Sequence, residues 1–296
     1  MSYPPWSPPF PMPADPNDPL VTPPGAGVGA WWARLLATLR GTWRQLLPLV
    51  VLCVGVPTAL FNGLTQVLIA SAVPASEVTP DTPPGEVFAA LFEDLAPALG
   101  VALIGSIVLA VFTAFAWGAG AWMIARWAAA QPVALGPALG YGLRRLPRVL
   151  GWSLVVTLMV LVGFCFCVLP GFYLAYALCL ALSVAVFERA NPVSRSFALT
   201  HRRFGLALGR ILIVAAVFIA PSVVLAIFEE VVLTAIGVGA AGSVGGFLVS
   251  AVFTLVSAPL YLVLYVGTLV TYAELRAWEA PLTSGMLAGE LLPAGR

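Results

Sequence analysis

Residues 149–187 read VLGWSLVVTLMVLVGFCFCVLPGFYLAYALCLALSVAVF, an almost unbroken apolar run. Each helical residue adds about 1.5 Å, so this run is far longer than one crossing of a hydrocarbon core of about 30 Å requires. Pro170 and Gly171 interrupt it near the midpoint, and proline ends a helix while glycine permits a tight turn. We therefore expect two membrane-spanning helices, 149–168 and 171–187, joined as a hairpin.

The composition extends this expectation to the whole chain. Its residues are 60% hydrophobic and only 9% charged, whereas soluble domains carry about 25% charged residues. Unpaired backbone groups are costly in lipid, and the alternation of a membrane barrel is missing, so the spans must be helices. The sequence predicts an all-α polytopic membrane protein with about six transmembrane helices, at residues 46–69, 99–124, 149–168, 171–187, 206–227 and 246–272.

The charged residues predict the topology. All 14 basic residues are arginine, and they occur before the first span, in alternate connections and after the last span. The other connections carry acids such as Glu77, Asp81 and Glu229, or no charge at all. Because positively charged loops stay inside, both termini are expected in the cytoplasm. The net charge of +1 offers no basic field for nucleic acid.

Three regions follow from the pattern. Residues 1–29 contain ten prolines and predict a disordered, Pro-rich cytoplasmic tail. Residues 30–279 form the membrane domain, and residues 280–296 form a short C-terminal tail. Within the domain, arginine-bearing amphipathic segments feed into the spans three times, which predicts three hairpins with short interfacial helices. One such helix begins at Asn191-Pro192, an N-cap followed by proline at the first helical position.

The arginines of two connections are the main candidates for a binding site. Arginine forks suit phosphate oxygens, and each cation near an anionic leaflet contributes about 1 kcal/mol. If the hairpins pack side by side, the residues expected to converge on lipid headgroups are Arg144, Arg145, Arg148, Arg195, Arg202, Arg203 and Arg210. The simpler alternative is that these arginines only set the topology.

A second candidate lies inside the first span. Asn62 and Gln66 are spaced i, i+4, and such a polar pair either lines a pathway or hydrogen-bonds to a neighbouring helix. The middle of each predicted span lacks ionisable residues of the kind that proton relays and ion-coupled carriers keep. With a single histidine, His201, and cysteines only within apolar runs, the sequence predicts no catalytic residues, no metal site and no cofactor.

Three segments together resemble a known family. They are Leu169-Pro170-Gly171-Phe172-Tyr173-Leu174, then Ala185-Val186-Phe187-Glu188, then the segment from Pro192 to Thr200. This pattern is similar to the membrane domain of some bacterial glycerophosphodiester phosphodiesterases and of its stand-alone relatives. In that family an L-P-G-x-x-L turn opens a span that ends in Glu, and an R-S-x-x-L-T-like amphipathic helix with a nearby aromatic residue follows. Phe204 takes the aromatic position here, and the resemblance covers about residues 135–215.

The resemblance implies a six-helix membrane module and carries no enzymatic activity to this chain. The phosphodiesterase chemistry of that family resides in a separate soluble barrel, which this chain cannot supply. We therefore expect a non-enzymatic module of the bacterial cytoplasmic membrane that binds anionic phospholipid or a partner membrane protein through its arginines. The alternative is a permease or export subunit for a small or amphipathic substrate. An intramembrane enzyme ranks third, because the spans lack a central acid or histidine.

Overall fold

The computed structural model describes residues 15–72, 83–235 and 244–292, and within that part of the chain every regular element is helical. The all-α prediction is therefore confirmed. In chain order the elements are α1 (Gly27–Val50), the π-helical segment η1 (Val51–Gly55), α2 (Val56–Ala72), α3 (Pro84–Ala128), α4 (Leu135–Phe166), α5 (Val168–Leu178), α6 (Ala181–Phe187), α7 (Pro192–Arg202), α8 (Phe204–Ala235), α9 (Val244–Ser257), α10 (Leu260–Ala277) and α11 (Ser284–Glu290).

Six helical stretches are long and apolar enough to cross a membrane. They are Gly27–Leu64, Leu103–Ala128, Leu135–Phe166, Val168–Phe187, Phe204–Ala235 and Val244–Ala277. Each overlaps one of the six predicted spans, so the chain is a multi-pass membrane protein. The predicted loop acids Glu77 and Asp81 lie outside the described residues.

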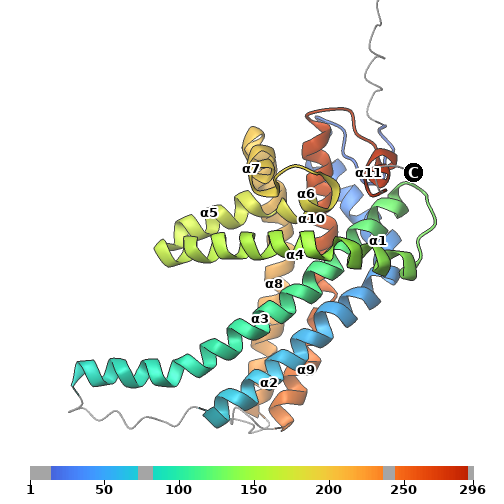
Figure 1. Cartoon of the computed structure of the whole chain (residues 1–296). Helices are drawn as coiled ribbons and strands as arrows, with labels where there is room; N and C mark the ends of the chain where they lie inside the picture. The colour runs from blue at the N-terminus through green and yellow to red at the C-terminus, as the bar shows by residue number, and fades with distance from the viewer. Residues whose placement is uncertain (1–14, 73–82, 236–243, 293–296) are drawn as a thin grey trace, which may run out of the picture.

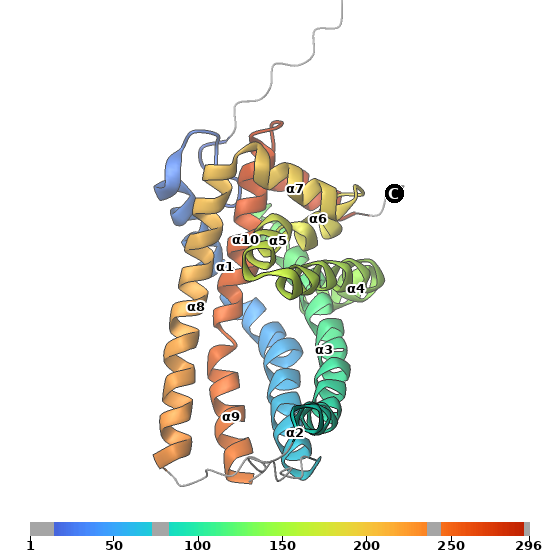
Figure 2. The same cartoon turned by 90° about the vertical axis from the view of Figure 1, so that its left-hand side faces the viewer.

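The helices run in two directions (Figures 1 and 2). The continuous stretch α1–α2, the second half of α3, α8 and the stretch α9–α10 extend along the length of the molecule and pack on one another. The α4–α5 hairpin runs across this direction and projects to one side. Amphipathic α7 and the short α11 lie at the end that carries Arg126, Arg145, Arg195 and Arg202, which we call the arginine end.

The buried core lies toward the arginine end, where α1, α3 and α10 meet. Its largest fully buried side chains include Trp31, Met123 and Tyr272. Small residues on α3 let neighbouring helices approach closely. A Cβ on Gly118 would lie 3.4 Å from the Cα of Gly142 in α4, so the two helices touch almost backbone to backbone.

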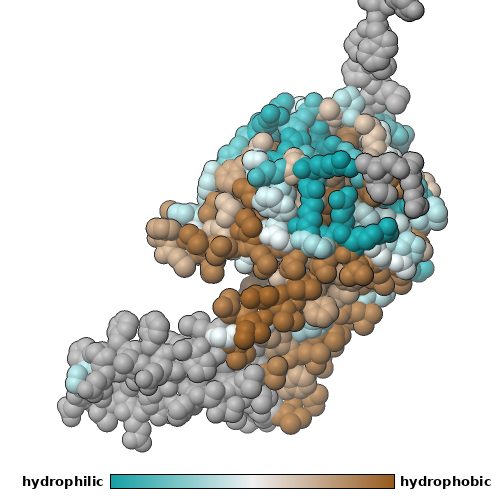
Figure 3. All heavy atoms as spheres, viewed as in Figure 1, coloured by the Kyte–Doolittle hydropathy of each residue, from teal (hydrophilic) through white to brown (hydrophobic). Residues whose placement is uncertain are grey.

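Away from the arginine end the surface is an apolar belt. Exposed valine, leucine and isoleucine side chains cover α8 and α9, among them Val223, Ile227, Val231 and Val252. Figure 3 shows this belt below a hydrophilic cap. Lipid tails are as apolar as these side chains, so the belt is the surface expected of membrane helices.

The turn of the α4–α5 hairpin differs in position from the prediction. The helix breaks at Cys167, whose backbone is extended with φ −173° and ψ 156°. Pro170 then falls in the first turn of α5, where its missing N–H costs no helical hydrogen bond. Proline therefore opens the returning helix here and does not itself form the turn.

Both predicted tails are partly folded. Leu20 and Val21 are buried, and the Arg34 guanidinium donates to the carbonyl oxygens of Pro16, Asp18 and Val21. The Asp18 carboxylate accepts hydrogen bonds from the backbone N–H and the hydroxyl of Ser284, at the start of α11. The expected disorder of residues 1–29 is thus wrong from Asp15 onward, because these contacts satisfy the backbone groups that prolines leave unpaired. Residues 1–14 lie outside the described part.

Candidate functional site

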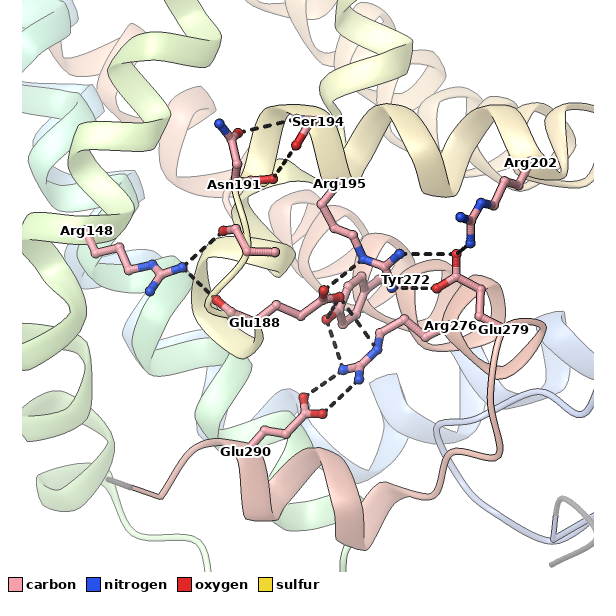
Figure 4. A network of polar contacts seen from close by, with 11 residues as sticks. Arg148, Glu188, Asn191, Ser194, Arg195, Arg202, Tyr272, Arg276, Glu279 and Glu290 are labelled. Atoms are coloured by element: carbon pink, nitrogen blue, oxygen red, sulfur yellow. Dashed lines mark hydrogen bonds and ion pairs between the residues drawn. The ribbon is translucent and has the colours of Figure 1, made fainter. Parts of the chain in front are cut away.

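A network of ion pairs joins α6, α7, α10 and α11 at the arginine end (Figure 4). Glu188, directly after α6, accepts from Arg195 Nε at 2.8 Å and from the Tyr272 hydroxyl at 2.9 Å. Arg276 on α10 lies 3.6 Å from the same carboxylate and pairs with Glu290 on α11 at 2.7 and 2.8 Å. Asn191 caps α7 through its side-chain oxygen, as the sequence predicts. The cap fixes where α7 begins and therefore the position of Arg195 on it.

Glu279, beyond α10, completes the network. It accepts hydrogen bonds from Arg195 Nη2 and Nη1, at 2.5 and 3.2 Å, and from Arg202 Nη1 at 2.6 Å. Burial opposes ionisation of Glu279, but the two guanidinium groups outweigh it and lower the pKa of this carboxyl. Burial likewise works against the charge of Arg195, yet Glu279 and Glu188 raise its pKa. Arg195 and Arg202 are therefore paired with acids within the protein.

Arg210 is also paired within the protein. Its guanidinium donates to both carboxylate oxygens of Glu274, at 3.0 and 3.2 Å, and lies 5.3 Å from the ring centre of Trp31. Arg203 stacks on Trp278 with 4.0 Å between its guanidinium carbon and the ring centre. Of the seven predicted site arginines, the four between α7 and the start of α8 thus have intramolecular partners: Arg195, Arg202, Arg203 and Arg210. Those on α4 form a different group.

Two of the α4 arginines, Arg144 and Arg145, border a pocket of about 850 Å³. It lies between the end of α3, the start of α4, the residues after α6, and α11. Its charged lining consists of Arg126, Arg144, Arg145 and Arg189 with Glu188 and Glu290, and its apolar lining includes Trp122, Phe187, Leu291 and Leu292. We call it the arginine pocket.

The arginines of the pocket keep hydrogen-bonding capacity. Arg126 donates through Nε to the Pro132 carbonyl at 3.2 Å, and Arg144 does so to the Gly140 carbonyl at 3.1 Å. Arg145 donates through Nε to the Tyr141 hydroxyl at 3.1 Å. Among the described residues, the terminal nitrogens of these three guanidinium groups have no hydrogen-bond partner and face no carboxylate within ion-pair distance. Glu188 and Glu290 are each held by other arginines, so the pocket has unbalanced positive charge.

Arg148 has a structural role beside this pocket. Its Nη2 donates to the carbonyl oxygens of Glu188 and Ala190, at 2.7 and 3.3 Å. A cation at the C-terminal end of a helix satisfies carbonyl groups that the helix leaves unpaired, here those after α6. Arg148 therefore ties α4 to the segment that carries Glu188.

The sequence missed part of the site. Arg126 and Arg189 were not among the predicted site residues, and neither were Tyr141 and Glu290. A signal was present for Arg126, because it shares a connection with Arg144 and Arg145. The approach of α11 to the end of α3 had no sequence signal, since the last residues were assigned to a tail.

Only one member of the predicted intramembrane pair, Asn62, has a described side chain. The side chain of Asn62 is exposed on α2, next to buried Gly63, and that of Gln66 lies outside the described side chains.

A small groove of about 260 Å³ separates α8 and α9, lined in part by Ser222, Thr254 and Tyr261. The Ser222 hydroxyl is bound to its own helix, at the Phe218 carbonyl. In the part of the chain that is described, no three His, Cys, Asp or Glu residues are placed to hold a metal ion.

No family model matches this chain, and neither a curated protein nor a solved structure is significantly similar to it. The functional argument therefore depends on the geometry of the site.

Proposed function

We propose that the chain is a non-enzymatic module of the bacterial cytoplasmic membrane that binds anionic phospholipid at the arginine pocket. One observation carries the proposal: three guanidinium groups with free terminal nitrogens surround a single pocket. Planar guanidinium forks recognise phosphate oxygens with two parallel hydrogen bonds. A phosphodiester headgroup supplies the acceptors that Arg126, Arg144 and Arg145 lack.

The lining of the pocket also suits a lipid. Charged groups stand beside Trp122, Phe187, Leu291 and Leu292, so polar and apolar walls meet in one cavity. The pocket lies in the hydrophilic cap next to the apolar belt (Figure 3). An amphipathic ligand can place its phosphate among the arginines while its chains remain toward the hydrocarbon.

The orientation is part of the proposal. With every arginine-bearing connection at one end, the positive-inside rule places the arginine pocket and both termini in the cytoplasm. The anionic lipids of the cytoplasmic leaflet then face the pocket. The resemblance to the membrane domain of glycerophosphodiester phosphodiesterases supports the same assignment, with the module acting on lipid or on a partner membrane protein and performing no hydrolysis itself.

A pair of charge-matched variants tests lipid binding. Arg144→Gln with Arg145→Gln removes two cations from the pocket, and Arg40→Gln with Arg44→Gln removes two exposed cations from α1. Each lost contact is expected to cost about 1 kcal/mol, so the pocket variant should bind phosphatidylglycerol roughly tenfold or more weakly. The α1 variant should change binding much less. Binding is measured by native mass spectrometry of purified protein, with phosphatidylcholine as the neutral reference lipid.

Equal losses in the two variants would contradict a specific pocket, because diffuse attraction depends only on the number of charges.

The permease alternative makes a different prediction. It expects a small substrate to stabilise the protein thermally and expects Asn62→Ala with Gln66→Ala to abolish that effect. The exposed position of Asn62 gives this alternative less support.

A further inference from the structure

The α4–α5 hairpin is the largest feature that the arginine pocket does not explain. It runs across the direction of the other long helices (Figures 1 and 2). Helix α4 packs mainly on α3, α5 and α6, and α5 packs mainly on α4 and α7. Neither arm packs along the length of α8 or α9, as a crossing helix of the same bundle would.

The returning arm is short. Helix α5 has 11 residues and is therefore about 16 Å long, roughly half of the hydrocarbon core. The helix then breaks, and α6 continues as a separate element whose Val184, Ala185 and Val186 are completely buried within the protein. Only α5 and the far half of α4 are available to face lipid.

The contacts of α5 fix its depth. Tyr173, at the middle of α5, has its hydroxyl 2.9 Å from His201 Nε2 on α7. Further along α5, the Tyr176 hydroxyl donates to the Thr200 carbonyl at 3.0 Å, and Ser196 on α7 donates to the Ala177 carbonyl at 2.7 Å. The middle and the C-terminal part of α5 therefore lie against the same amphipathic helix.

Helix α7 belongs to the arginine end, because it carries Arg195 and Arg202 and both pair with Glu279. A hairpin that crossed the bilayer would place its turn about 30 Å from that end. Tyr173 follows Cys167 at the turn by only about 9 Å of helix. Its contact with His201 therefore leaves no room for such a separation. The arginine distribution does not distinguish the two arrangements, since a hairpin returns to the side it left whether or not it crosses.

The outer surface of the hairpin identifies what surrounds it. From Leu154 to the turn, the exposed side chains are apolar except for Thr157, and Phe166 and Leu169 at the turn are 84% and 77% exposed. Leu158, Leu161 and Phe172 extend this surface on both arms. Aromatic side chains gather where α5 meets α7, as at a membrane–water interface.

We infer that the α4–α5 hairpin inserts into the leaflet at the arginine end without crossing the bilayer, and that its partner is the acyl chains of that leaflet. The four stretches Gly27–Leu64, Leu103–Ala128, Phe204–Ala235 and Val244–Ala277 then make the crossings. Four crossings leave both termini on one side, as six would. The inference is independent of lipid binding at the arginine pocket.

The native cysteines at the turn make the depth measurable. Cys165 and Cys167 are exposed. A variant that keeps only Cys167, with the other three cysteines replaced by Ala, is labelled with a nitroxide and reconstituted in phosphatidylcholine–phosphatidylglycerol vesicles. Two reference variants lack all native cysteines and carry Ser194→Cys, exposed on α7, or Thr234→Cys, exposed at the opposite end of α8.

The nitroxide at Cys167 should lie between the bilayer midplane and the interface marked by Ser194→Cys. Its depth follows from the ratio of its relaxation by oxygen and by a water-soluble nickel complex. An impermeant maleimide applied from the side that labels Thr234→Cys should leave Cys167 unlabelled. A nitroxide at or beyond the midplane, or labelling of Cys167 together with Thr234→Cys, would overturn the inference. Thermal unfolding of each variant, compared with that of the unsubstituted chain, checks that the variant is folded. Mass spectrometry of the unsubstituted chain after maleimide treatment reports which native cysteines are labelled.

Discussion

Replacing Glu274 with Gln leaves the buried Arg210 guanidinium without its counter-charge. The two residues join α8 to α10 through a pair of hydrogen bonds, at 3.0 and 3.2 Å. Their side chains are only 9% and 2% exposed, and Trp31 covers the guanidinium. We therefore expect the contribution of Arg210 to the free energy of unfolding to depend strongly on Glu274, and that of Glu274 to depend on Arg210.

The magnitude follows from the cost of an uncompensated buried charge. Removing one partner of a buried pair typically destabilises a protein by about 3–5 kcal/mol. Arg210 lies in the second turn of α8, where a long side chain can shift its charge toward the interface, so we expect about 3 kcal/mol for Glu274→Gln. Replacing both residues, as Arg210→Met with Glu274→Leu, should cost clearly less than the sum of the single changes.

The free energy of unfolding is measured in detergent micelles by denaturant titration, followed by circular dichroism. Arg202→Gln is the control, because its side chain is 65% exposed and such a pair contributes at most about 1 kcal/mol. If Glu274→Gln costs no more than that control, or if the two single changes simply add up, the reasoning about an interdependent buried pair is wrong.

Two further predictions concern packing and pH. Gly142→Ala should destabilise the protein by about 1–3 kcal/mol in thermal unfolding, because its Cβ would lie 3.0 Å from the Phe115 carbonyl oxygen of α3. Gly140→Ala, with nothing within 4 Å of its Cβ, should be neutral or stabilising on the same helix, and similar losses at both positions would argue against the close contact. The folded pKa of Glu279 is lowered from its ordinary value of 4.5, so its contribution to stability is present above about pH 4.5 and is lost as the pH falls through the lower folded pKa. Glu279→Gln should flatten the decline in melting temperature over that acidic range, and an unchanged pH profile would show that this carboxyl is not linked to folding.

The candidate site was predictable only as a region. Of the arginines between the second and third predicted spans, the predicted site residues Arg144 and Arg145 line the pocket, together with Arg126, which was not predicted as a site residue. Arg195, Arg202 and Arg210 look identical to them in the sequence but are paired with Glu279 or Glu274, far away along the chain. Which arginine is free depends on which acid lies nearby, and a linear pattern does not contain that distance.

The ends of the chain show the same limit. Proline-rich residues before α1 have no helical or strand periodicity, so the sequence predicts no packing for them. Leu20 is nevertheless completely buried, and Asp18 binds Ser284. The hydrogen bonds that order this segment come from Arg34 and from the opposite end of the chain, which only the folded structure brings together.

The amino-acid sequence was enough to show that hydrocarbon surrounds most of this protein, because the free energy of transferring an apolar run into hydrocarbon is a sum over neighbouring residues. The approximate bounds of the apolar helices followed for the same reason. The alternation of basic connections along the chain was enough to place the arginines at one end. The tertiary structure alone decided which guanidinium groups remain unpaired and in which direction the α4–α5 hairpin extends. Those properties depend on contacts between residues on separate helices, such as that of Tyr173 with His201. The hydropathy of the chain is the same whether or not the hairpin crosses the bilayer.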